Sequence, residues 1–294
     1  YSKDRATEIM GVPNVAHFDL EAKPERGNIQ QLVNFIVSDL DTAIRMNQTD
    51  EQYRFTVDVA RAYLARTYFW AQDWENAIKV AREVLNKYPL VEGDEYKEMI
   101  QSPQGMSGEM LFRTFITGSL TSYNRYLKNV KTRPVNMSLI SLFTEKGRDI
   151  RYSTFFDSKF FSTKGIRTCV RSAEMCLILA ESYAHLSDND NALKYLNLLR
   201  SKRISNYEPY SMATLPAASE GEVIKVDATG TKLTPLVAAI LNERRKELFM
   251  EGDRWFELKR NGSPEFWFGY NQIKYTTEKF LYTFPLRKAD IIAN

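Results

Sequence analysis

The stretch at residues 236–260, LVAAILNERRKELFMEGDRWFELKR, constrains the fold more than any other part of the chain. Its apolar residues recur at helical spacing and predict an amphipathic helix with one buried face. These positions are Leu236, Val237, Ile240, Leu241, Leu248 and Phe249. Gly252 predicts a left-handed helix stop, after which a second short helix carries Trp255, Phe256 and Leu258.

The predicted buried face also carries charge. Arg244 lies one turn from Ile240 and from Leu248, and Glu247 and Glu251 follow along the same side. A charge facing a core is tolerated only when an opposite charge pairs with it. We therefore interpret five residues as a structural ion-pair network between packed helices: Glu243, Arg244, Glu247, Glu251 and Arg254. The alternative is a catalytic carboxylate cluster, but no His, Cys or Ser in this stretch could share the chemistry, and we assign no catalytic residue.

Composition narrows the class of protein. The 294 residues are 44% hydrophobic, enough for a large core in one domain or two closely packed ones. A net charge of +3, with no block of basic residues, predicts no nucleic-acid partner. Aromatic residues make up 13% of the chain, which suits a surface that stacks and hydrogen-bonds at once.

The cysteines and histidines predict no cofactor or metal. Cys169 and Cys176 are seven residues apart on an expected helix, roughly 10 Å along its axis, too far for a disulfide. We therefore expect both to be core residues. The two histidines, His17 and His185, are far apart in the sequence, which argues against acid–base, triad or metal chemistry built on histidine.

The sequence gives no direct indication of compartment. It has no run of about 18 apolar residues that would span a membrane, and no signal peptide opens it. Tyr1 is not an initiator methionine, so we expect a fragment or a processed chain.

Two helix pairs have the spacing of tetratricopeptide repeats. The first lies near residues 56–89 and the second near residues 171–203, and the same Leu-Ala-Tyr-Ala pattern occurs in both. The pattern consists of Leu64, Ala65, Tyr68 and Ala77 in the first pair and Leu179, Ala180, Tyr183 and Ala192 in the second. The small alanines predict a close approach of the helices within each pair.

The remaining segments frame these pairs. Residues 29–46 carry an apolar stripe and predict a helix, after an irregular lead-in at residues 1–27. Loop-rich insertions are expected at residues 90–168, with a short strand at residues 111–116 and a short helix at residues 138–143, and at residues 205–234 as a surface excursion.

Several of these blocks resemble the SusD/RagB family, in the order in which the family has them. The block ER--EL--EG-R--EL-R from Glu243 to Arg260 looks like its C-terminal signature. RSAEMCLILAE and LNLLRSKR (residues 171–181 and 196–203) resemble "R-AE--L--AE" and its continuation, and DLDTAI (Asp39 to Ile44) resembles the "I--DL--A" helix. FPLRKADIIAN at residues 284–294 resembles the closing segment, although Arg287 stands where a second Pro is usual. The family's N-terminal part, with its lipid-anchored Cys, has no counterpart here.

The resemblance implies a mostly all-α fold, in which residues 1–294 form a single SusD-like domain with a tetratricopeptide-like scaffold and a short hairpin. The C-terminal signature would occupy residues 236–294. The resemblance further implies a non-enzymatic glycan-binding lipoprotein of the outer membrane, as in Bacteroidetes-type bacteria. Such a protein holds oligosaccharide on the cell surface for a SusC-type TonB-dependent transporter. It needs no cofactor or metal.

Two other functions remain open. A plain tetratricopeptide scaffold would bind peptides in a concave groove, although here the repeats are separated by insertions. A glycoside hydrolase would need a carboxylate pair such as Glu243 and Glu247, but flanking Arg244 and Arg245 would lower their pKa values, which is wrong for a general acid.

The candidate ligand residues are Tyr123, Asn124, Arg125 and Tyr126, in the stretch SLTSYNRYLK. The two rings would stack on adjacent sugars while Asn124 and Arg125 reach hydroxyl groups. The alternative is that both tyrosines fill gaps beneath the insertion. The next candidates are Tyr207 and Tyr210.

Overall fold

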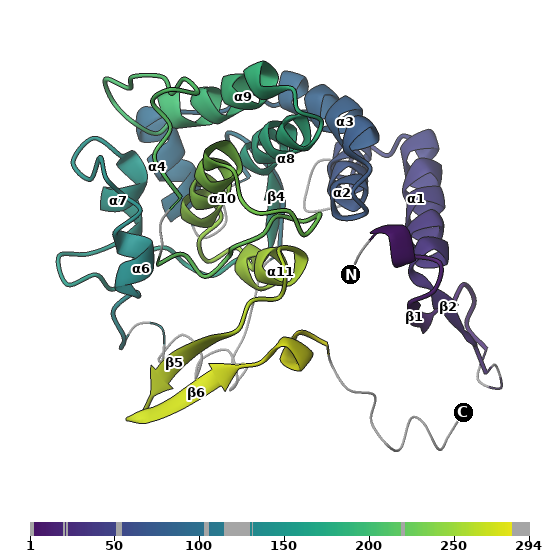
Figure 1. Cartoon of the computed structure of the whole chain (residues 1–294). Coiled ribbons are helices and arrows are strands. Elements are labelled where there is room, and N and C mark those ends of the chain that lie inside the picture. The colour runs from purple at the N-terminus through teal and green to yellow at the C-terminus, as the bar shows by residue number, and fades with distance from the viewer. Residues whose placement is uncertain are drawn as a thin grey trace. The chain divides into compact units, whose positions relative to one another are not determined.

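The computed structural model describes residues 3–19, 21, 23–50, 55–102, 106–114, 130, 132–218 and 221–283. The chain divides into two compact units. The larger unit consists of Leu40–Ala218 and Thr234–Arg254, and the smaller of Tyr1–Asp39, Ser219–Leu233 and Trp255–Asn294. Helices dominate the described residues, alongside three two-stranded sheets, so the predicted mostly α-helical fold is confirmed (Figure 1).

The two predicted repeats form the core of the larger unit. Helices α2 (Val57–Trp70) and α3 (Trp74–Lys87) make one antiparallel pair, and α8 (Ser172–His185) and α9 (Asn189–Ser201) make the other. Helix α8 also packs against α2 and α3, which joins the pairs (Figure 1). The alanines of the pattern are fully buried, namely Ala65, Ala77, Ala180 and Ala192. A larger side chain at any of these positions would hold the helices apart.

The two repeats also turn in the same way. Gln72 and Ser187 both adopt the left-handed conformation, with φ of 59° and 61°. The aspartate that follows each of them caps the next helix, and Asp73 accepts a hydrogen bond from the backbone N–H of Asn76. Asp188 does the same for the second repeat. An aspartate at this position satisfies a backbone N–H that the first turn would leave without a partner.

The described part of the first insertion contains more helix than the sequence predicts. It contains α4 (Gly93–Gln101), α6 (Met137–Ile140) and α7 (Ile150–Phe155), and the helix expected at residues 138–143 is thus shorter and starts earlier. These helices share an apolar cluster that includes Tyr96, Met99, Ile100, Ile140, Phe143 and Phe155. That cluster explains these helices, because burying large side chains stabilises short helices that are unstable alone.

The expected strand in this insertion pairs with a segment that the sequence assigns to a helix. Strand β3 (Met110–Arg113) runs antiparallel to β4 (Cys169–Arg171), which leads directly into α8. Cys169 is therefore in a strand and not on the helix of Cys176. Both are buried free thiols. In the second insertion Ile224 and Ala228 are buried, so that segment is not only a surface excursion.

The C-terminal signature forms two helices. Helix α10 (Pro235–Glu247) begins at the Thr234 cap and ends before Gly252, the predicted stop. The intervening turn has Met250 and Gly252 in the left-handed conformation, with φ of 65° and 81°, and α11 (Asp253–Arg260) follows. The chain therefore leaves the helix one turn earlier than the apolar pattern indicates.

In the smaller unit the expected irregular lead-in contains a hairpin of β1 (Met10–Pro13) and β2 (Arg26–Asn28). Helix α1 (Ile29–Met46), whose residues up to Asp39 belong to this unit, has the predicted bounds, but none of its residues is fully buried. Near the other end of the chain, β5 (Phe266–Tyr270) and β6 (Ile273–Thr277) form a second hairpin (Figure 1).

Candidate functional site

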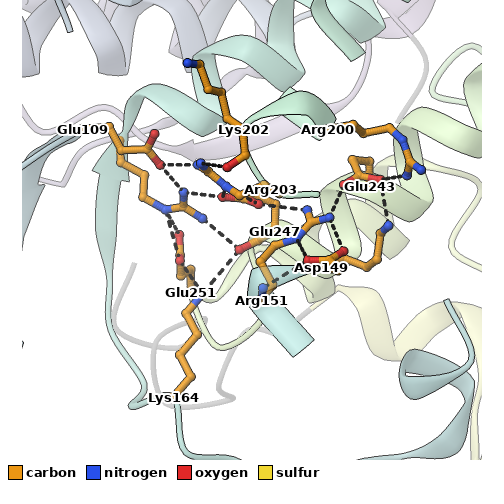
Figure 2. Close-up of polar contacts among 12 residues, drawn as sticks. Glu109, Asp149, Arg151, Lys164, Arg200, Lys202, Arg203, Glu243, Glu247 and Glu251 are labelled. Atoms are coloured by element: carbon orange, nitrogen blue, oxygen red, sulfur yellow. Dashed lines mark hydrogen bonds and ion pairs between the residues drawn. The ribbon is translucent and has the colours of Figure 1, made fainter. Parts of the chain in front are cut away.

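A buried charge cluster lies where the larger unit brings together α7, β4, α9 and α10 (Figure 2). It consists of Glu109, Asp149, Arg151, Lys164, Arg171, Arg200, Arg203, Glu243, Lys246, Glu247 and Glu251, whose side chains are at most 4% exposed. Carboxylates and cations nearly balance, as burial in a core of low polarity requires.

Glu247 is the centre of the cluster. Its carboxylate binds Arg151 at 2.9 Å, Arg171 at 2.7 Å and Arg203 at 3.1 Å, and it is fully buried. Burial alone raises the pKa of a carboxyl group, but these three guanidinium groups outweigh it and hold the pKa of Glu247 far below its ordinary value. These guanidinium groups therefore favour the ionised form of Glu247 at neutral pH.

A second carboxylate, Glu109, bridges two of the same arginines from the far side. It accepts hydrogen bonds from Arg171 at 2.7 Å and from Arg203 at 2.8 Å (Figure 2). The Arg203 guanidinium also stacks on the ring of Tyr96, 4.0 Å from its centre. Planar guanidinium groups with several donors suit such sites, because one group can bind two carboxylates and a ring at once.

Glu251 lies at the lower left of the cluster in Figure 2, above Lys164, and its carboxylate is 2.6 Å from Lys164 and 3.0 Å from Arg171. Burial raises the pKa of the Glu251 carboxyl, but the charges of Arg171 and Lys164 have the larger effect and lower this pKa to about 2. Burial also lowers the pKa of Lys164, to about 8, against the opposing effect of Glu251.

Glu243 and Asp149 complete the other end. Glu243 binds Arg151 at 2.5 Å, Arg200 at 2.7 Å and Lys246 at 2.8 Å, and these cations lower its pKa well below the ordinary value although burial acts in the opposite direction. Asp149 makes a two-point contact with Arg151 through hydrogen bonds of 2.9 and 2.7 Å.

Arg244 lies apart from this cluster, unlike the arrangement predicted on one helix face. It binds Asp253 through hydrogen bonds of 2.9 and 2.5 Å, and its guanidinium lies 5.3 Å from the ring centre of Phe69. Glu174, which pairs with Arg66, is 3.9 Å away. The carboxylates of α10 instead meet arginines from other elements.

Arg254, the fifth residue of the predicted network, is half-buried at the start of α11. The arginines that bind Glu247 lie 44 to 96 residues before it in the sequence, and none of them was part of the predicted network. Two of them stand in the family-like blocks, since RSAEMCLILAE begins at Arg171 and LNLLRSKR ends at Arg203.

This geometry suits a structural role and not acid–base catalysis. A general acid must hold a proton near neutral pH, whereas the adjacent cations, acting against burial, keep Glu243, Glu247 and Glu251 ionised. His185 is stacked on Trp74 with ring centres 4.3 Å apart. Among the described residues, no group of three or more His, Cys, Asp or Glu side chains is placed to hold a metal ion.

The predicted ligand residues Tyr123, Asn124, Arg125 and Tyr126 lie outside the described residues. The next candidates, Tyr207 and Tyr210, are half-buried against Arg200, whose guanidinium lies 5.1 and 4.2 Å from their ring centres. Burial raises the pKa of both phenols. They hold the outer end of Arg200 in place, so most of their ring surface already contacts protein.

Exposed aromatic rings occur instead on the β5–β6 hairpin. Trp267, Phe268 and Tyr275 are 65%, 46% and 41% exposed. The aromatic run FWFGY followed by Asn271 is the sequence signal for such a hairpin.

Comparison with known proteins identifies the family to which this architecture belongs. The model of the SusD family matches residues 118–289, more than half of the chain, and a tetratricopeptide repeat model matches residues 61–90. No curated protein matches the sequence.

Solved structures of low sequence identity share the fold. A SusD superfamily protein from Bacteroides thetaiotaomicron is 20% identical with a TM-score of 0.75, and the match covers 100% of this chain and 71% of that one. A SusD-like carbohydrate binding protein from Bacteroides vulgatus is 18% identical with a TM-score of 0.70 and the same coverage. A SusD superfamily protein from Bacteroides fragilis is 18% identical with a TM-score of 0.71, covering 100% and 70%. The family match over residues 118–289 and the shared fold together establish that this chain belongs to the SusD family.

Proposed function

We propose that this protein binds carbohydrate at the cell surface and passes it to a SusC-type TonB-dependent transporter for nutrient uptake. The observation that carries the proposal is membership of the SusD family, one member of which is described as a carbohydrate binding protein. The proposal includes anchoring to the outer membrane through a lipid. Among the described residues no helix is long and apolar enough to cross a membrane.

The electrostatics support a binding protein and not a hydrolase. The charge cluster joins helices inside the larger unit, and its carboxylates are buried and already engaged by cations. A sugar could not reach them without opening the core, and they carry no proton to donate. We also propose that both compact units act as one functional domain, because the family match runs through segments of each.

Tyr123, Asn124, Arg125 and Tyr126 remain our proposed ligand residues in the first insertion. The aromatic rings can stack on the C–H faces of a sugar, and the amide and guanidinium groups can form hydrogen bonds with its hydroxyl groups.

The test is binding of the purified chain to a panel of soluble polysaccharides: amylopectin, xyloglucan, arabinoxylan, pectic galactan and inulin. In native gel electrophoresis, at least one polysaccharide should retard the protein, and calorimetry should then give its affinity. Bovine serum albumin on the same gels controls for viscosity. Retardation by none of them would contradict carbohydrate binding.

The second candidate is a peptide-binding tetratricopeptide scaffold, which the repeat match at residues 61–90 favours. Binding of peptides from a random library, without binding of any polysaccharide of the panel, would support this second candidate. Release of reducing ends from any polysaccharide in the panel would instead indicate a hydrolase.

A further inference from the structure

The β5–β6 hairpin has two different faces. A two-residue turn, Asn271 and Gln272, connects the strands, and both residues have positive φ, at 48° and 64°. This turn fixes the register, so that Trp267 lies opposite Thr276 and Gly269 opposite Lys274. Because side chains alternate between the faces of a strand, these four residues share one face. The other face carries Phe266, Phe268, Tyr275 and Thr277.

The face that carries Trp267, called the shelf below, consists of Trp267, Gly269, Lys274 and Thr276. Trp267 is 65% exposed. A Cβ atom added at Gly269 would meet nothing within 4 Å, so this face is open at Gly269. The Lys274 ammonium lies 5.2 Å from the centre of the indole ring, and Thr276 is directly across the ladder. The indole ring of Trp267 therefore shares an open face with the Lys274 ammonium and the Thr276 hydroxyl.

The size and polarity of this shelf favour a sugar over a protein partner. A protein interface needs roughly 800 Å² from each partner with a dry apolar centre. This face offers a single large ring among polar and small residues. A pyranose matches it, because its C–H face covers an indole while its hydroxyls bind an ammonium and a threonine.

We propose that the Trp267 face of the hairpin is a carbohydrate subsite, with Trp267 stacking on one sugar ring and Lys274 and Thr276 binding its hydroxyl groups. The inference rests on the proposed function and names a place for it. The contact between Lys274 and the indole is weak at an exposed site, so the ammonium moves to a sugar oxygen at little cost.

The opposite face supplies a matched control. Phe268 and Tyr275 stack on each other with ring centres 5.5 Å apart and planes inclined by 18°. Phe268→Ala removes a partly exposed ring from the same hairpin without touching the shelf. Comparing it with Trp267→Ala therefore separates loss of a subsite from loss of the hairpin.

The experiment measures affinity for whichever panel polysaccharide the wild type binds. Trp267→Ala should weaken binding about tenfold or more, the size expected for a lost stacking contact with its buried area. Trp267→Phe should retain part of the affinity, and Phe268→Ala should bind like the wild type. The bound polysaccharide should also protect wild-type tryptophan fluorescence from acrylamide quenching, and Trp267→Phe should lack that protection. Circular dichroism checks that each variant is folded.

Wild-type affinity in Trp267→Ala would overturn the subsite while leaving carbohydrate binding intact. Equal losses in Trp267→Ala and Phe268→Ala would also overturn it, because hairpin integrity and not stacking would then be responsible. A wild type that binds no polysaccharide would overturn both the subsite and the proposed function.

Discussion

Replacing Glu247 by glutamine tests whether the buried charge cluster stabilises the fold. The substitution keeps the shape of the side chain and removes its charge. Arg151, Arg171 and Arg203 would then share a neutral amide in place of the carboxylate that they now bind at 2.9, 2.7 and 3.1 Å. Glu109 still offsets part of the charge of Arg171 and Arg203.

The magnitude follows from burial. Breaking a buried ion pair by changing one partner costs about 3–5 kcal/mol, because the remaining charge stays buried without compensation. With three guanidinium groups affected and Glu109 compensating in part, we expect a loss of about 4 kcal/mol in the free energy of unfolding. Urea unfolding followed by circular dichroism measures it.

The matched control is Glu92→Gln. Glu92 pairs with Lys202 at 3.0 Å, but its side chain is 61% exposed, so solvent screens the pair. Its loss should change the free energy of unfolding by less than about 1 kcal/mol. If Glu247→Gln were no more destabilising than this control, the structural role of the cluster would be refuted.

Three further predictions concern other sites. Arg244→Ala should destabilise the fold by roughly 3 kcal/mol, because it leaves Asp253 without its partner, while polysaccharide affinity of the folded fraction stays unchanged; a wild-type melting temperature with lost binding would contradict this. The stabilisation from Glu251, whose pKa is lowered to about 2, should be fully present above about pH 4.5 and lost as pH falls towards 2. The melting temperatures of wild type and Glu251→Gln should therefore converge over that pH range. A constant difference between the two melting temperatures would contradict this prediction. The double substitution of Tyr123 and Tyr126 by alanine should weaken polysaccharide binding roughly tenfold; unaltered affinity in a folded variant would remove that site.

Much of the helical scaffold could be predicted because its signals are local. Helix α1 has the predicted bounds, since an apolar stripe at helical spacing is visible within a few turns. In the first repeat, Thr56 caps α2 and the buried Ala65 and Ala77 allow the helices to approach. Such features depend on neighbours a few residues away.

The predictions that were wrong concern segments whose structure depends on distant partners. Cys169 belongs to a strand because β3, more than 50 residues earlier, pairs with it. Met10–Pro13 forms a hairpin with β2, whereas the sequence predicted an irregular lead-in at residues 1–27. Local propensity is weak compared with pairing and burial, so it does not decide these segments.

The repeats, the charged character of α10 and the family could be predicted from residue spacing and local motifs. Which charges meet depends on the folded structure, because Glu247 binds Arg151, which is 96 residues away, while Arg244 binds Asp253. The exposure of Trp267 on one face of a hairpin also depends on the folded structure. The physical reason is that an ion pair or an exposed ring depends on distance and burial in three dimensions, which packing sets.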